Sequence, residues 1–300
     1  MTQQVRLKLP ATSANLGPGF DAVALALKLY LEVTATPAPA FSLRATGRNA
    51  DVCGALEQNL LLETYRATLH AQGREVVPLA LEVCNGIPLG MGCGSSAAVR
   101  LAGIALASSF GSLGWTRERI LAEASKLEGH PDNAAACWLG GFSLAAWDGT
   151  QLQALSLQPP AAWKAMLVFP EKPLATTAAR AVLPAAFSRA DVVNNLQRVG
   201  LLTAAFAQGR GELLHNAMLD RIHQPYRGEI CPLLPQLLPL AGEHGILGAA
   251  LSGAGPAVLL ILESETAIGP ARAQVHERIN GTQPTEIIVC DLESAPALWD

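Results

Sequence analysis

The segment Pro88 to Ala98, with the sequence PLGMGCGSSAA, has the composition of a loop that binds an anion. Its residues are Pro88, Leu89, Gly90, Met91, Gly92, Cys93, Gly94, Ser95, Ser96, Ala97 and Ala98. Alternating glycines let backbone N–H groups point into one concavity, and the small residues that follow favour a helix whose positive end faces the same space. The hydroxyls of Ser95 and Ser96 can bond to a phosphate or to a water on Mg²⁺. A tight turn with a serine N-cap would explain the same residues, so the loop alone leaves both interpretations open.

Two better-known phosphate-binding loops do not match this segment. A P-loop needs a lysine before its Ser or Thr, and a dinucleotide-binding loop needs the pattern GxGxxG. A dehydrogenase also needs an acidic residue about 20 positions later, whereas the stretch Ser108 to Gly114 contains none. These differences argue against a dehydrogenase.

The segment Pro10 to Asp21, PATSANLGPGFD, gathers hydroxyls, the Asn15 amide and the Asp21 carboxylate into a turn between two apolar stretches. Turns rich in such groups often line binding sites. An Asx-type turn that only connects two strands explains the composition equally well.

The segment Glu128 to Asn133, EGHPDN, places two carboxylates, an imidazole and an amide at the expected end of a helix, and Glu123 lies about one turn earlier. Mg²⁺ prefers oxygen ligands and usually takes one or two carboxylates together with phosphates and water. Because five positions separate Glu123 from Glu128, the two point to different sides of the helix, and we expect only one to contact a metal. A solvated helix end with His130 near the negative pole of the dipole is the alternative.

Composition limits the kinds of partner. The net charge of −4 comes from 21 basic and 25 acidic residues with no basic run, so we expect no nucleic acid partner. No signal peptide precedes the first strand, and the apolar run from Gly245 to Leu262 is interrupted by glycine and proline, so we expect a cytoplasmic protein without membrane spans. The six cysteines are scattered without metal-ligand spacing, which indicates reduced thiols.

Helices and strands alternate along the chain without a strict βαβ repeat. We expect strands at Val5–Leu9, Phe41–Ala45, Leu79–Cys84, Ala165–Phe169 and Ala257–Leu262, and in the segment GGFSLAAW. We expect helices at 59–72, 95–110 and 116–127, while 22–33 fits either type of element. Pro10 should end the first strand, and Gly129 and Pro131 should end the third helix. The prolines at 159 and 160 favour a domain boundary near residue 158.

The segments PATSANLGPGFD, PLGMGCGSSAA, EGHPDN and LSGAGPA, in this order and spacing, resemble the motifs of the homoserine kinase family in the GHMP kinase superfamily. The resemblance implies an α+β fold of two domains. Residues 1–158 would form an ATP-binding domain like domain 2 of ribosomal protein S5, and residues 159–300 a ferredoxin-like α+β domain. The implied reaction is transfer of the γ-phosphoryl of ATP to the side-chain hydroxyl of L-homoserine, a step of threonine synthesis, and a homodimer is an expected state.

The resemblance also implies roles for individual residues. The glycine loop would hold the triphosphate of ATP, and an exposed Cys93 inside it would make ATP binding sensitive to alkylation. The implied substrate contacts are Asn15, Asp21, His130, Asn133, Thr176, Arg180 and Arg227. The implied catalytic residues are Asp21, Ser95 and Asn133. Two arginines suit the α-carboxylate of an amino acid, since a guanidinium can clamp it through two parallel hydrogen bonds.

The metal ligands and the role of Asp21 stay open in the sequence. We predict that Glu123 and Ser95 bind Mg²⁺, with Glu128 as the alternative ligand. Asp21 could accept the proton of the substrate hydroxyl or only orient the substrate. Another GHMP kinase acting on a different small alcohol is the main alternative function, and a non-catalytic nucleotide-binding protein of the same fold is a second.

Overall fold

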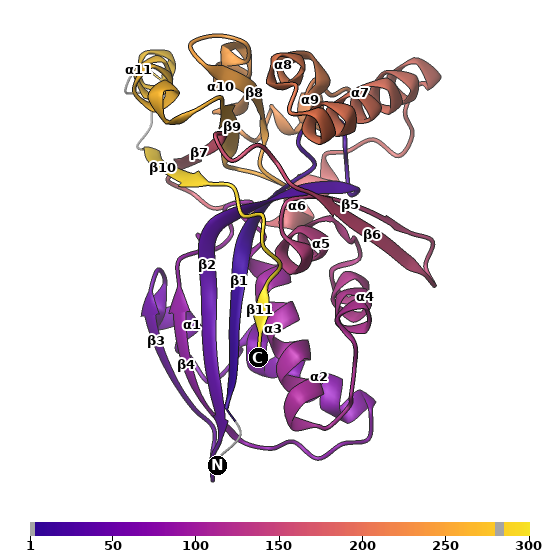
Figure 1. Ribbon diagram of the computed structural model, residues 1–300, viewed down its shortest axis with the longest axis vertical. Helices are drawn as coiled ribbons and strands as arrows, with labels where there is room; N and C mark the ends of the chain where they lie inside the picture. The colour runs from indigo at the N-terminus through magenta and orange to yellow at the C-terminus, as the bar shows by residue number, and fades with distance from the viewer. Residues whose placement is uncertain (1–3, 280–284) are drawn as a thin grey trace.

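The computed structural model describes residues 4–279 and 285–300, and its strands form two separate sheets (Figure 1). The larger sheet has the order β11-β1-β2-β4-β3, and β2 also pairs with β5, which pairs with β6. The smaller sheet has the order β10-β7-β9-β8, with every pair antiparallel. The strands are β1 Val5–Ala14, β2 Val23–Pro37, β3 Ser42–Gly47, β4 Leu79–Asn85, β5 Phe142–Trp147, β6 Leu152–Leu157, β7 Lys164–Pro170, β8 Ile246–Leu251, β9 Val258–Leu262, β10 Thr285–Asp291 and β11 Leu298–Trp299.

The helices divide between the two sheets. They are α1 Ala50–Cys53, α2 Leu60–Ala71, α3 Ser95–Phe110, α4 Arg117–Glu128, α5 Asp132–Leu139, α6 Thr176–Ala181, α7 Arg189–Gln208, α8 Leu214–Ala217, α9 Gln224–Arg227, α10 Leu234–Leu237 and α11 Ile268–Ile279. In Figure 1, α2 to α5 lie beside the larger sheet, and α7 to α11 lie over the smaller sheet, on its side away from the larger one. Helix α3 carries small and aliphatic side chains on most of its surface and is mostly buried. Its N-terminus, the positive end of the helix dipole, lies at Ser95.

Pro10 does not end its strand as predicted, whereas α4 does end at Gly129, before Pro131, and the structure adds an unpredicted helix after that proline. Strand β1 continues past Pro10, where a register shift between Pro10 and Ala11 marks a bulge. A bulge lets a proline stay in a strand because the missing N–H is not needed in the ladder there. Pro131 opens the additional helix α5 at Asp132, since the first N–H groups of a helix have no partner within the helix in any case. Asp132 and Asn133 are thereby fixed at a helix start.

The chain passes from the larger to the smaller sheet between β6 and β7. We propose that the boundary between two domains lies there, near residue 158. The end of the chain returns to the larger sheet, because β11 pairs with β1 with Leu7 opposite Trp299. None of the helices in the described ranges is long and apolar enough to cross a membrane.

Candidate functional site

The glycine loop opens onto a cavity of about 530 Å³ whose lining comes from both halves of the chain. Residues of α3, α5 and α6 line it, together with the turn after β1 and the turn between β8 and β9. Three carboxylates and three guanidinium groups belong to the lining. The volume lies in the range of small-molecule sites, and the charges indicate a polar ligand.

The glycine loop is packed closely between Thr12 on one side and Ser252 on the other. Gly92 and Gly94 adopt positive φ angles of 79° and 68°, and a Cβ atom on Gly94 would lie 1.9 Å from Thr12 Oγ1. On the other side, a Cβ on Gly92 would lie 2.1 Å from the Ser252 carbonyl oxygen, and Ser252 Oγ donates to the Gly92 carbonyl at 2.7 Å. Only glycine fits such approaches, so the sequence GMGCG fixes a concavity at the start of α3.

Cys93 is buried inside this loop, with 1 % of its surface exposed, and burial raises the pKa of its thiol. The condition of an exposed Cys93, on which sensitivity of ATP binding to alkylation depends, is therefore not met. We expect iodoacetamide at about pH 8 to label the exposed Cys84 and to leave Cys93 unlabelled until the protein is denatured. Mass spectrometry of proteolytic peptides measures both thiols in one sample. Labelling of native Cys93 as fast as Cys84 would contradict this burial.

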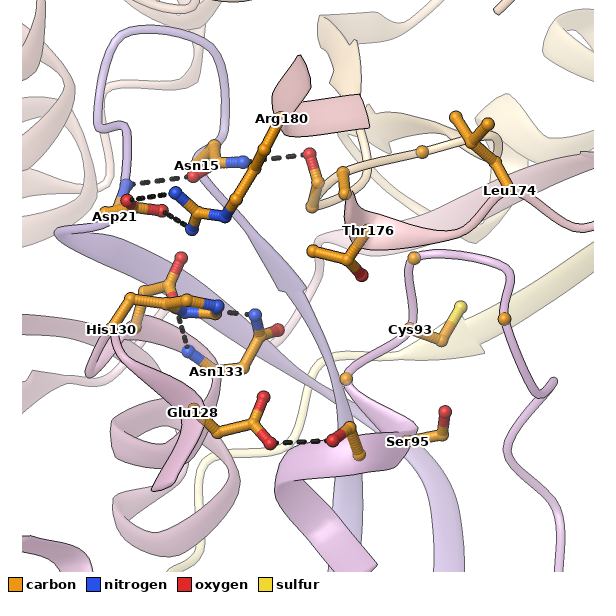
Figure 2. Close-up of a pocket in the computed structure, with 18 of the residues that line it drawn as sticks. Asn15, Asp21, Cys93, Ser95, Glu128, His130, Asn133, Leu174, Thr176 and Arg180 are labelled. Carbon is orange, nitrogen blue, oxygen red and sulfur yellow. Dashed lines mark hydrogen bonds and ion pairs between the residues drawn. The ribbon is translucent and has the colours of Figure 1, made fainter. Parts of the chain in front are cut away.

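At the end of the cavity beside the glycine loop, the side chain of Glu128 lies against the start of α3 (Figure 2). Ser96 Oγ donates to Glu128 Oε1 at 2.6 Å, and Arg100 Nε lies 2.7 Å from the same oxygen. Figure 2 shows the Ser95 hydroxyl on the side of the helix start away from Glu128. Glu123 does not line the cavity and forms an ion pair with Arg119 at 2.5 Å. The packing of α4 on α3 thus brings Glu128, and not Glu123, to the glycine loop.

At the other end of the cavity, Asp21 and Arg180 form a two-point ion pair across the two halves of the chain, with N–O distances of 2.7 and 3.0 Å (Figure 2). Asn15 holds the turn, because its Oδ1 accepts from the Asp21 N–H at 3.0 Å and its Nδ2 donates to the Gly253 carbonyl at 2.8 Å. Asn15 and Asp21 have φ angles of 71° and 54°. Asn and Asp adopt the left-handed conformation more readily than other residues with side chains, so these two residues suit the tight turn that carries Asp21 to the cavity.

Arg227 is the second cation at this end, and its side chain is almost fully buried. Its Nε donates to the Ala179 carbonyl at 3.1 Å, and its Nη1 lies 3.2 Å from both the Gly253 carbonyl and His223 Nδ1. Burial lowers the pKa of Arg227, and the charge of Arg180 lowers it further. Two guanidinium groups close enough to repel each other in this way make a site for an anion such as a carboxylate.

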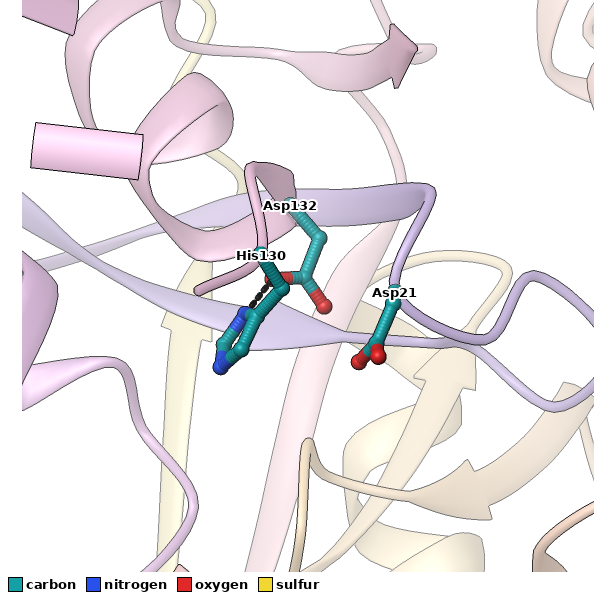
Figure 3. A group of neighbouring side chains, drawn as sticks. All are labelled: Asp21, His130 and Asp132. Atoms are coloured by element: carbon teal, nitrogen blue, oxygen red, sulfur yellow. Dashed lines mark hydrogen bonds and ion pairs between the residues drawn. The ribbon is translucent and has the colours of Figure 1, made fainter. Parts of the chain in front are cut away.

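Asp21, His130 and Asp132 gather at this end of the cavity (Figure 3), and one possible ligand atom from each lies within 4.8 Å of the other two. His130 Nδ1 lies 2.5 Å from Asp132 Oδ1. Burial works to lower the pKa of His130, but the hydrogen bond and the charge of Asp132 outweigh it and raise the pKa. Asn133 is fixed beside them, since its Oδ1 accepts from Thr12 Oγ1 at 2.7 Å. This cluster can accept a small cation, either an ammonium group or a metal ion.

Two family models match the chain, the GHMP kinases N terminal domain over residues 59–141 and the GHMP kinases C terminal over residues 202–281. A homoserine kinase of Solibacter usitatus is 46% identical over 86% of this chain and 84% of that protein. The chain belongs to the homoserine kinase family of GHMP kinases. A homoserine kinase of Deinococcus radiodurans is 37% identical over 90% of this chain and 88% of its own length. The crystal structure of homoserine kinase from Cytophaga hutchinsonii superimposes with a TM-score of 0.84 at 25% identity, covering 100% of this chain and 98% of that one.

Membership of this family confirms the two-domain α+β GHMP kinase fold and makes the chain an ATP-dependent kinase. The order β10-β7-β9-β8 of the smaller sheet, with helices between β7 and β8 and between β9 and β10, is a ferredoxin-like arrangement.

The residues predicted to contact substrate come together around the cavity. Its lining includes Asn15, Asp21, His130, Asn133, Thr176, Arg180 and Arg227. From the glycine loop it includes Gly90, Gly92, Cys93, Gly94, Ser95 and Ser96. Pro88, Leu89 and Met91 instead line a separate groove, and Ala97 and Ala98 are buried in the core. The outer part of the predicted loop therefore shapes the site without facing it.

Besides Leu174 and the turn residues 253–255, three polar lining residues were missed by the sequence analysis. The EGHPDN pattern does not single out Asp132, but its burial beside His130 marks it as a partner of that imidazole. Thr177 follows Thr176 directly and lines the same wall. Arg100 carried the clearest signal, because it is the only charged residue in α3 and stands four positions after Ser96, on the same face of the helix.

A second, more apolar pocket of about 260 Å³ adjoins the cavity and shares Ser95 and Ser96 with it. Leu43, Val83 and Val99 contribute to its wall. An apolar pocket of this size next to the glycine loop can take a flat aromatic group.

Proposed function

We propose that this chain transfers the γ-phosphoryl group of ATP to the side-chain hydroxyl of L-homoserine and releases O-phospho-L-homoserine. One observation carries the proposal: a single cavity joins an anion-binding glycine loop to a set of paired opposite charges. The first end suits a triphosphate, and the second suits a zwitterionic amino acid. The homoserine kinases that share up to 46% of their residues with this chain support the same substrate.

ATP would lie with its triphosphate along the loop Gly90 to Ser96 and its adenine in the adjoining apolar pocket. The backbone N–H groups at the start of α3 and the helix dipole would face the phosphates. Both pockets contain Ser95 and Ser96, so one nucleotide can reach from one to the other.

Glu128 and Ser96 provide the oxygen atoms that a Mg²⁺ ion on the phosphates requires. A hydroxyl that donates its proton to a carboxylate still has lone pairs for a metal, and the two oxygens lie only 2.6 Å apart. We therefore propose these two residues as ligands in place of Glu123 and Ser95. Bound Mg²⁺ would neutralise charge on the phosphates. The cavity needs such a cation, because its three carboxylates offset its three guanidinium groups.

The α-carboxylate of homoserine would bind between Arg180 and Arg227, and its ammonium group near Asp21 and Asp132. The hydroxyl would then point along the cavity toward Asn133 and the glycine loop. Phosphoryl transfer has a loose transition state and depends on alignment and charge neutralisation more than on a strong base. Since the ammonium group of the substrate would take the place of Arg180 at the two oxygens of Asp21, we propose that Asp21 orients the substrate and is not the general base.

A coupled assay tests the proposed function directly. The protein with Mg²⁺ and ATP is expected to release ADP when homoserine is added, and mass spectrometry should identify O-phosphohomoserine. Threonine, mevalonate and galactose serve as comparison substrates. ADP release with one of these and none with homoserine would indicate another small-alcohol kinase, and bound ATP without turnover would indicate a non-catalytic protein.

A further inference from the structure

Arg100 lies in the wall of the cavity at its phosphate-binding end and contacts both the end of α4 and the carboxylate of Glu128. Its Nη1 donates to the Leu127 carbonyl at 2.6 Å, and its Nε lies 2.7 Å from Glu128 Oε1 in an ion pair that lacks hydrogen-bond geometry. One hydrogen bond and one ion pair, made through different nitrogens of a rigid guanidinium group, hold Arg100 between the two helices. Arg100 therefore ties the start of α3 to the end of α4 in one orientation.

Only one carboxylate oxygen of Glu128 makes the contacts described above. Ser96 Oγ donates to Oε1, and Arg100 Nε forms its ion pair with the same oxygen. Among the residues that the structure describes, none hydrogen-bonds to Oε2. A carboxylate held in this way cannot rotate freely, and it keeps one oxygen for a ligand in the cavity.

We infer that Arg100 is a positioning residue for the bound metal ion: together with Ser96 it fixes Glu128 Oε1 so that Oε2 faces the cation on the phosphates. This inference rests on the proposed function and on the proposed role of Glu128. Groups that orient a metal ligand commonly contribute ten- to a hundredfold to metal affinity.

A second ion pair on α4 provides a comparison. The side chains of Arg100 and Glu128 are 26% and 10% exposed, whereas those of Arg119 and Glu123 are 55% and 25% exposed. Exposed pairs of this kind contribute little to structure or function. Burial and the cavity location distinguish the Arg100 pair from an ordinary surface pair.

Charge and orientation predict opposite effects for the loss of Arg100. By charge alone, a guanidinium beside the carboxylate repels a divalent cation, so its removal should strengthen metal binding. By orientation, its removal frees the Glu128 side chain and should weaken metal binding. The sign of the change therefore separates the two roles.

Binding of Mn²⁺ to the enzyme–ADP complex tests the inference without turnover. Free Mn²⁺ is measured by electron paramagnetic resonance for the wild type, Arg100→Ala, Arg100→Lys and the matched control Arg119→Ala. We expect Arg100→Ala to weaken Mn²⁺ binding about ten- to a hundredfold. Arg100→Lys should remain weakened, because an ammonium group restores the charge without the planar fork, and Arg119→Ala should bind like the wild type. Unchanged or tighter binding in Arg100→Ala, or full recovery in Arg100→Lys, would overturn the inference.

The same titration with Glu128→Gln separates the inference from the proposed function. Weak Mn²⁺ binding in Glu128→Gln together with wild-type binding in Arg100→Ala would support Glu128 as a metal ligand and contradict only the role of Arg100. Wild-type Mn²⁺ binding in Glu128→Gln would contradict the proposed metal site itself. Steady-state kinetics add a further readout, since a positioning role raises the Mg²⁺ requirement of Arg100→Ala and leaves the KM for homoserine unchanged. A global disturbance of the fold, seen as a lower Tm, would instead change both parameters in Arg100→Lys as well.

Discussion

Replacing Glu128 by Gln is expected to lower kcat about a hundred- to a thousandfold while leaving the KM for homoserine close to that of the wild type. The amide keeps the size of the side chain but loses the charge that would hold Mg²⁺ on the transferred phosphate. Stabilisation of transition-state charge by a metal amounts to several kcal/mol, and about 1.4 kcal/mol corresponds to a tenfold change in rate. Initial rates at saturating ATP, measured over a series of Mg²⁺ concentrations, check this result.

Glu123→Gln is the matched control for this prediction. Glu123 stands on the same helix, pairs with Arg119 and lies outside the cavity lining. Loss of an exposed pair changes activity by about twofold or less. A large loss of kcat in Glu123→Gln combined with a small loss in Glu128→Gln would indicate that Glu123, which the sequence spacing favoured, is the metal ligand.

The choice between these two glutamates shows what local sequence patterns leave open. The run of small and aliphatic residues after the glycine loop predicted α3 to its end residues, and Thr116 caps α4, as predicted, by accepting the Arg119 N–H. Both features depend on neighbours in the chain. The direction of Glu128 depends instead on how α4 packs against α3, which no short stretch of sequence encodes.

The strand that continues past Pro10, the unpredicted helix after Pro131 and the burial of Cys93 have the same origin. A proline ends or opens an element according to whether its missing N–H is needed, and the partner strand decides this at Pro10. Cys93 lies in a loop that reads as exposed, but contacts from Thr12 and Ser252 enclose that loop. The residues around the substrate cavity were found because the motif pattern named them, whereas Arg100 and Asp132 stand out mainly through their contacts.

The ion pair between Asp21 and Arg180 leads to the second large expected effect. Arg180→Met should raise the KM for homoserine. We expect kcat/KM to fall roughly thirty- to several-thousandfold, which corresponds to a loss of about 2–5 kcal/mol in transition-state stabilisation. The variant loses a clamp for the α-carboxylate and leaves Asp21 without its partner. Steady-state kinetics with homoserine and with ATP varied in turn measure the change, and the KM for ATP should stay close to the wild-type value.

Arg221→Met is the control for Arg180→Met, because Arg221 is exposed, lies 3.7 Å from Asp191 and is absent from the cavity lining. It should behave like the wild type. A similar rise in the KM for homoserine in both variants would indicate a general effect of lost positive charge. It would contradict the proposal that Arg180 binds the α-carboxylate.

The substrate must replace both halves of the Asp21–Arg180 pair, since each oxygen of Asp21 is bound to Arg180. Homoserine brings a carboxylate for Arg180 and an ammonium group for Asp21, so no charge is left unpaired. 4-Hydroxybutyrate brings only the carboxylate and would leave Asp21 alone, a cost that a zwitterion avoids. In Asp21→Asn that cost disappears. The variant should therefore prefer homoserine over 4-hydroxybutyrate much less than the wild type does, with kcat for homoserine nearly kept and its KM raised. If kcat falls instead while the preference is unchanged, Asp21 acts on the proton of the hydroxyl and the exchange of ion pairs does not explain selectivity.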